Sequence, residues 1–218
     1  MLEFLLYMVF SVLESSALFY LGFKIFKIDL YPKEIVFAGL IMAVFSYFIR
    51  VNNGFAELDV LTQYALVFCF FWLLFRIHIF YSAIMTGMSY LLYMLFQSTF
   101  YLLLNSTPIF NLHFLGISIG IYFLQLVSAL SAFAFGFYIG KKRMGFDFIP
   151  DKPNERIIIG SHEKILFSLS FPSIIVVALM IYFFERYSQF FIVVPLFYVV
   201  LLFGYLNYSI KKNRGEEF

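Results

Sequence analysis

Glu14 is the residue whose type and position in this sequence point most directly to chemistry. It interrupts the apolar run LEFLLYMVFSVLESSALFYLGF near its centre. A carboxylate there, in a membrane-spanning helix, costs about 2.5–3.5 kcal/mol and should face protein or water, not lipid. Tyr7, Ser11 and Glu14 share one helical face. Two interpretations stay open: a protonated Glu14 hydrogen-bonded within a helix bundle, or a Glu14 that binds a polar group or a cation, or senses protons.

A second set of polar side chains recurs between positions 79 and 104. Its members are three or four positions apart and therefore line one side of a helix: Ser82, Thr86, Tyr90, Tyr93, Gln97 and Tyr101. Within lipid, such a face must turn toward other helices or a wet cavity. Interhelical hydrogen bonding and ligand binding both explain it.

Gln125 links these two features, because it lies at a depth in its own apolar stretch similar to that of Gln97. We expect Glu14, Gln97 and Gln125 to converge on one polar pocket. The predicted ligand-binding residues are Glu14, Tyr90, Tyr93, Gln97, Tyr101 and Gln125.

The sequence contains no arrangement typical of an enzyme. Cys69 and His78 are nine residues apart, or about 13 Å along a continuous helix, so they cannot form a thiol–imidazole pair there. His78, His113 and His162 fall in separate connections without the spacing of metal ligands. Neither a Gly-rich phosphate loop nor an H-E-x-x-H motif occurs. We therefore expect no catalysis, no metal site and no cofactor.

The composition is that of an integral membrane protein. Of the 218 residues, 63% are hydrophobic and only 13% are charged, about half the roughly 25% of an average soluble domain. The net charge of +2 does not suggest nucleic acid as a partner. The single cysteine, Cys69, excludes an intramolecular disulfide.

The elements that must position these residues are transmembrane helices. Seven apolar stretches are of about the length needed to cross a hydrocarbon core of roughly 30 Å at 1.5 Å per residue. The predicted fold is an all-α, polytopic helix bundle with about seven spans, or six if one stretch does not span. The predicted spans are Leu2–Phe23, Glu34–Val51, Val60–Phe75, Ile79–Leu104, His113–Gly140, Ile165–Phe184 and Phe190–Ser209.

The basic residues between these spans predict the orientation, because cytoplasmic connections retain positive charge during insertion. With the N-terminus outside and the C-terminus in the cytoplasm, thirteen of the fifteen basic residues lie inside, and only Arg50 and Arg186 lie outside. Residues 1–218 then form a single transmembrane domain, with residues 141–164 as a cytoplasmic loop and residues 210–218 as a short cytoplasmic tail. We expect a multi-pass protein of a bacterial cell membrane.

Small residues form a strip along the fifth predicted span. Residues with small side chains recur at every fourth position, broken only by Leu124: Gly116, Gly120, Ser128, Ala132, Gly136 and Gly140. Such a strip lets helix backbones approach closely. We expect a helix-packing interface, within this chain in preference to a second copy, although a homo-oligomer stays open.

Two segments resemble a known family. They are the opening LEFLLYMVFSVLESSALFYLGFKIFKIDLYPKE and the segment GFDFIPDKPNERIIIG. In hydropathy and composition, most of the chain resembles the membrane sensor regions of bacterial quorum-sensing receptor histidine kinases of the GHKL ATPase type. The resemblance implies a sensor of secreted peptides. No phosphoacceptor histidine follows the last predicted span, so kinase activity is not expected of this chain. Two possibilities stay open: signalling through a separate chain, or modulation of a kinase by helix pairing.

The expected function is that of a non-catalytic receptor or sensor in the lipid bilayer. The predicted external connections, Asn52–Asp59, Asn105–Leu112 and Glu185–Gln189, are too short to fold as soluble domains. A small or peptide ligand would therefore bind between helices or at the outer surface. Two alternatives stay open: a substrate-binding subunit of a small-solute transporter with a separate ATPase chain, and an accessory or immunity-type membrane protein.

Overall fold

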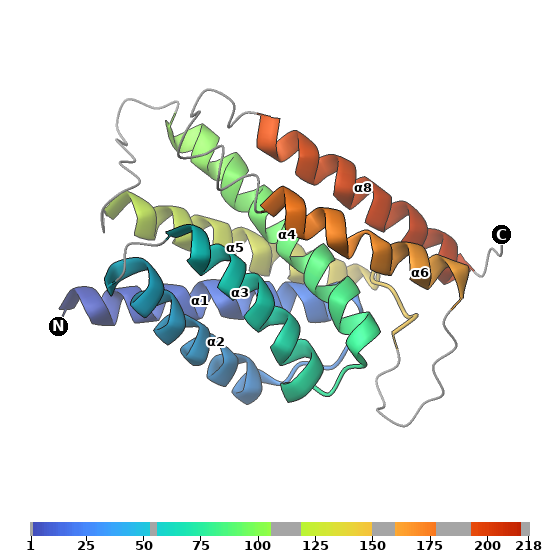
Figure 1. Cartoon of the computed structure of the whole chain (residues 1–218), viewed down its shortest axis with the longest axis horizontal. Coiled ribbons are helices and arrows are strands. Elements are labelled where there is room, and N and C mark those ends of the chain that lie inside the picture. The colour runs from blue at the N-terminus through green and yellow to red at the C-terminus, as the bar shows by residue number, and fades with distance from the viewer. Residues whose placement is uncertain (1, 53–55, 106–118, 150–159, 178–192, 215–218) are drawn as a thin grey trace.

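The computed structural model of the chain is all-α, as predicted, and describes residues 2–52, 56–105, 119–149, 160–177 and 193–214 (Figure 1). Two π-helical segments continue α2 and α3: η1 (Tyr47–Asn52) and η2 (Phe70–Leu74). Seven α-helices have both ends within the described residues: α1 (Leu2–Ile25), α2 (Pro32–Ser46), α3 (Ala56–Cys69), α4 (Ile79–Asn105), α5 (Ile119–Lys142), α6 (Ser161–Ser168) and α8 (Val193–Arg214). Residues 170–177, after a turn at Leu169, are helical as well.

Four of these helical stretches are long and apolar enough to cross a membrane. They are Glu3–Ile25, Pro32–Val51, Ile79–Leu104 and Gly120–Lys142. Large apolar side chains remain exposed on their outer faces, among them Val9, Phe37 and Phe137. In water such surfaces would associate, whereas lipid accommodates them. The chain is therefore a multi-pass integral membrane protein.

The other three predicted spans are shorter or only partly described. Leu58–Leu74 and Lys164–Val177 are apolar helical stretches of less than spanning length. The predicted spans Ile165–Phe184 and Phe190–Ser209 extend into residues 178–192, outside the described part. A total of seven spans stays a prediction.

Local sequence explains several helix boundaries. Pro32 stands in the first turn of α2, where its missing N–H removes no helical hydrogen bond. Lys24 lies in the last turn of α1, and Lys141 and Lys142 lie in the last turn of α5, so each cation is near the negative end of a helix dipole. A turn at Leu169 interrupts the helix around Pro172, because the proline ring clashes with a carbonyl group one turn earlier.

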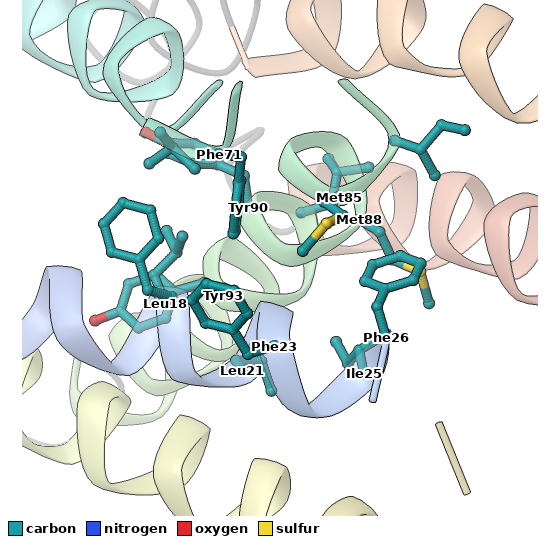
Figure 2. Close-up of a cluster of buried hydrophobic side chains, with 14 of the residues drawn as sticks. Leu18, Leu21, Phe23, Ile25, Phe26, Phe71, Met85, Met88, Tyr90 and Tyr93 are labelled. Carbon is teal, nitrogen blue, oxygen red and sulfur yellow. The ribbon is translucent and has the colours of Figure 1, made fainter. Parts of the chain in front are cut away.

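Helix α4 crosses the bundle and joins its two groups of helices (Figure 1). On one side it packs against α1, α3 and α5, and on the other against α6 and α8. The buried core lies along the contact of α1 with α4 and η2 (Figure 2). Phe23 of α1 packs edge to face on Phe71 of η2 with the ring centroids 5.7 Å apart, and Met88 of α4 belongs to the same buried cluster. The rings of Phe19 and Phe71 pack edge to face with their centroids 5.3 Å apart, a favourable aromatic geometry.

Close packing of α5 on α1 uses the predicted small-residue strip. A Cβ atom added at Gly136 would lie 2.9 Å from a ring carbon of Tyr20 on α1, and one at Gly140 would lie 3.2 Å from Lys24. Ser128 and Ala132 of the same strip are fully buried. The partner of this strip is therefore a helix of the same chain. Gly120 lies in the first turn of α5, and Gly116 lies outside the described residues.

The segment after α5 ties the C-terminal ends of α1 and α8 together. The backbone N–H of Phe146 donates to the carbonyl of Ile25 (2.7 Å). Lys27 forms an ion pair with Asp147 (2.6 Å), and the N–H of Asp147 donates to Oδ1 of Asn213 (3.1 Å). These contacts gather basic residues of three helices at one end of the bundle.

Candidate functional site

Glu14 receives hydrogen bonds from two glutamines on different helices. The side-chain amide of Gln97 on α4 donates to Oε1 of Glu14 (3.3 Å), and that of Gln125 on α5 donates to Oε2 (2.8 Å). The three side chains predicted to converge thus lie together. The pairwise packing of α1, α4 and α5 brings them within reach of one another.

These residues line a cavity of about 90 Å³ inside the bundle. A water molecule needs a site of at least about 10–15 Å³ by this measure, so the cavity has room for a small ion with water but not for a folded peptide. Polar side chains from six helical segments line it: Ser11, Glu14 and Ser15 from α1, Ser46 from α2, Arg50 from η1, Asp59 and Gln63 from α3, Tyr90, Tyr93 and Gln97 from α4, and Gln125 from α5.

Asp59 is the second carboxylate of the cavity and is held by several donors. Nη2 of Arg50 lies 3.0 Å from its Oδ2, which also accepts a hydrogen bond from Ser46 (2.9 Å). The amide of Gln63 donates to Oδ1 (3.2 Å). Only 2% of the Asp59 side chain is exposed, compared with 38% for Arg50. The ion pair therefore has a buried anion and a cation that reaches the surface.

The hydroxyl of Tyr7 extends this network. It lies 2.6 Å from Oγ of Ser46. Because the Ser46 hydroxyl proton is directed to Asp59, the Tyr7 hydroxyl is the donor to Ser46. The π-helical segment η1 carries Arg50 to Asp59, and such segments are frequent at functional sites.

Some polar atoms of the cavity residues are buried without a hydrogen-bond partner. Within the described part of the chain, these are Oη of Tyr93, Oε1 of Gln125 and Nε of Arg50. Tyr93 and Gln125 are only 2% and 4% exposed. Buried polar atoms are nearly always hydrogen-bonded in native proteins. The cavity therefore presents groups that a ligand or water can satisfy.

Five of the six predicted ligand-binding residues line this cavity: Glu14, Tyr90, Tyr93, Gln97 and Gln125. Tyr101, further along α4, is not among the lining residues. Two other members of the polar face, Ser82 and Thr86, are buried and donate to carbonyl groups at Ile77 and Ser82. The polar face of α4 therefore combines a cavity wall with locally satisfied hydroxyls.

Sequence reasoning missed the contribution of Arg50 and Asp59. Both were placed at the edge of an external connection, whereas the structure pairs them inside the cavity wall. One signal was available: Arg50 was an exception to the predicted charge distribution. A nearby carboxylate was the natural partner for such a residue.

The described residues include no group of three His, Cys, Asp or Glu side chains that could hold a metal ion. The cavity instead combines two carboxylates, one guanidinium, three amides and two phenols. Such a set can bind and orient a small polar ligand. No protein-family description, curated protein sequence or solved structure matches this chain.

Proposed function

We propose that this chain is a non-catalytic, receptor-like or sensor-like membrane protein that binds a small ligand in the Glu14 cavity. The observation that carries the proposal is the set of unpartnered buried atoms on Tyr93 and Gln125. Buried polar atoms are nearly always hydrogen-bonded in native proteins, and these two face a cavity in which a ligand can supply the missing partner. The arrangement around Glu14 draws on three helices, so a ligand there contacts α1, α4 and α5 at once.

The proposal includes the predicted orientation, with the N-terminus outside. Basic residues assigned to the inside, including Lys27 and Lys24, lie at the end of the bundle where α1 and α8 finish. Arg50, assigned to the outside, lies near the start of α1, where the ring of Tyr47 packs against Phe4 and Tyr7. In this orientation the partly exposed Arg50 connects the cavity to the outer surface.

A route for signalling also supports the sensor proposal. Ligand binding at Glu14 acts on α1, whose C-terminal end contacts the segment after α5. That segment binds the end of α8 through Asp147 and Asn213. A shift of α1 therefore alters the proposed cytoplasmic face, where a separate kinase or ATPase chain would bind.

Ligand binding is tested by thermal unfolding of the full chain in lipid nanodiscs. The probes are amino acids, short peptides, primary amines and alkali-metal salts. We expect one class to raise the unfolding midpoint of the wild type saturably, but not that of Glu14→Gln or Gln97→Ala. Both variants should fold, because Gln is isosteric with Glu and the Gln97 bond is long. A wild type that responds to no class would contradict the proposal.

The output is tested by extracting the full chain from its native membrane in mild detergent and identifying bound chains. A histidine kinase or GHKL-type chain would support the sensor proposal. A transport ATPase would instead support a solute-binding transporter subunit, for which the same cavity would serve. A further class of partner would favour an accessory role.

A further inference from the structure

We infer that the Glu14 cavity binds a monovalent cation, through the carboxylate of Glu14, Oε1 of Gln125 and Oη of Tyr93. The cation is an alkali-metal ion or the ammonium group of a small amine. This inference rests on the proposed function and specifies the ligand of that same cavity.

The charges of the cavity are unequal. It contains the carboxylates of Glu14 and Asp59 but only one cationic side chain, Arg50. Asp59 already forms the ion pair with Arg50. Among the residues that the structure describes, no ion pair involves Glu14. An ionised Glu14 therefore leaves the cavity with one net negative charge, which a single positive charge would balance.

The hydrogen bonds around Glu14 are those of a carboxylate. Each of its oxygens accepts an N–H from a glutamine amide. A protonated carboxyl group would need an acceptor for its own proton; neither amide that contacts it supplies one in this arrangement, so the proton would have to go to the Tyr93 hydroxyl beside it. A proton is the competing occupant, and the experiment below distinguishes it from a cation.

The unpartnered atoms next to Glu14 include two oxygens. Gln125 uses its amide N–H to bind Glu14, which leaves its Oε1 buried without a partner. The Tyr93 hydroxyl lies beside the Glu14 carboxyl group and interacts with it electrostatically, but within the described residues its oxygen does not reach hydrogen-bond geometry with any partner. Carbonyl and carboxylate oxygens inside membrane proteins coordinate Na⁺ and K⁺. An ammonium group can donate hydrogen bonds to the Glu14 carboxylate, to Oε1 of Gln125 and to Oη of Tyr93.

A divalent ion fits this site poorly. Ca²⁺ takes six to eight oxygen ligands and commonly more than one carboxylate. The second carboxylate here, Asp59, is occupied by Arg50, Ser46 and Gln63. Two positive charges would leave an uncompensated charge in the bundle. The charge balance and the number of free carboxylates therefore favour a monovalent cation over a divalent one.

The test is thermal unfolding of the full chain in nanodiscs made of uncharged lipid. Sodium, potassium or methylammonium chloride replaces choline chloride at constant chloride concentration. We expect saturable stabilisation of the wild type, since a ligand that binds the folded state raises its stability. Glu14→Gln should abolish the response. Tyr93→Phe should weaken apparent affinity at least tenfold because it removes only the unpartnered oxygen.

Tyr101→Phe is the matched control for Tyr93→Phe, because Tyr101 is on the same helix but does not line the cavity. Its response should equal that of the wild type. Stabilisation by sodium or potassium alone identifies a metal ion, and stabilisation by methylammonium alone identifies an amine; either supports the inference. A response that persists in Glu14→Gln overturns it.

Failure of the inference and failure of the proposed function are distinguishable. If uncharged or anionic probes stabilise the wild type and the three cations do not, the cavity binds a ligand of another class and only the inference fails. If acidification to pH 5 stabilises the wild type but not Glu14→Gln, and no cation does so, the occupant is a proton and the inference fails. If nothing stabilises the wild type, both proposals fail.

Discussion

Gln125 donates its side-chain amide to Oε2 of Glu14 over 2.8 Å, although the two residues are 111 positions apart in the sequence. The bond joins α5 to α1, the two helices that the small residues at Gly136 and Gly140 bring close together. The packing of small residues therefore sets the distance between α1 and α5 at which Glu14 and Gln125 can form their hydrogen bond. In this bond Gln125 uses its N–H, which leaves its side-chain carbonyl free at the cavity.

Tyr7→Phe should destabilise the folded chain by about 1 kcal/mol, the typical net contribution of one hydrogen bond. It removes the hydroxyl that lies 2.6 Å from Ser46 but keeps the buried ring. Tyr47→Phe is the matched control, because Tyr47 contributes ring contacts with Phe4 and Tyr7. Denaturant unfolding in detergent measures both. If the two substitutions changed the free energy of unfolding equally, the hydrogen bond between Tyr7 and Ser46 would not be an important source of stability.

Asp59→Ala should lower the free energy of unfolding by about 1–3 kcal/mol, because it leaves buried donors without their acceptor. Those donors are the Ser46 hydroxyl, the Gln63 amide and the Arg50 guanidinium. The double variant Asp59→Ala/Arg50→Leu should recover part of the loss, since no unpaired cation remains. A double-mutant cycle measures the coupling. Strictly additive effects would show that the ion pair contributes nothing.

Gly145→Ala should destabilise the chain by about 1–3 kcal/mol through overpacking. An added Cβ would lie 2.6 Å from the carbonyl oxygen of Ile25 and 2.8 Å from that of Lys24. Both are backbone atoms, which cannot turn away as a side chain would. Gly204→Ala is the control, because its Cβ would meet only Leu169 at 3.5 Å. Thermal unfolding should show a lower midpoint for Gly145→Ala alone.

The proposed orientation predicts which positions a membrane-impermeant maleimide labels in intact cells. The starting variant is Cys69→Ser, which removes the single cysteine. Met144→Cys, at an exposed position after α5, should be labelled only after the membrane is opened. Asn53→Cys, in the predicted external connection, should be labelled at once. The opposite pattern would show that the N-terminus is cytoplasmic.

Residue composition and helical spacing were sufficient to predict an all-α membrane protein, because a bilayer requires long apolar segments whose backbones satisfy their own hydrogen bonds. The same rule identified Glu14 and the polar side of α4, since polar groups at that depth are expensive and must face protein or water. The small-residue strip of α5 was visible for a related reason: only small side chains allow helix backbones to approach closely.

The partners within the site were decided by tertiary structure. Helical spacing shows which residues share a face but not which faces meet, so the Arg50–Asp59 pair and the place of Gln63 beside it came only from the packing of α2 on α3. Tyr101 shares the helical face of Tyr93, yet it lies beyond the cavity. The sequence by itself determined the chemistry that each helix carries. Only the crossing and depth of the helices decided which of those groups enclose a common space.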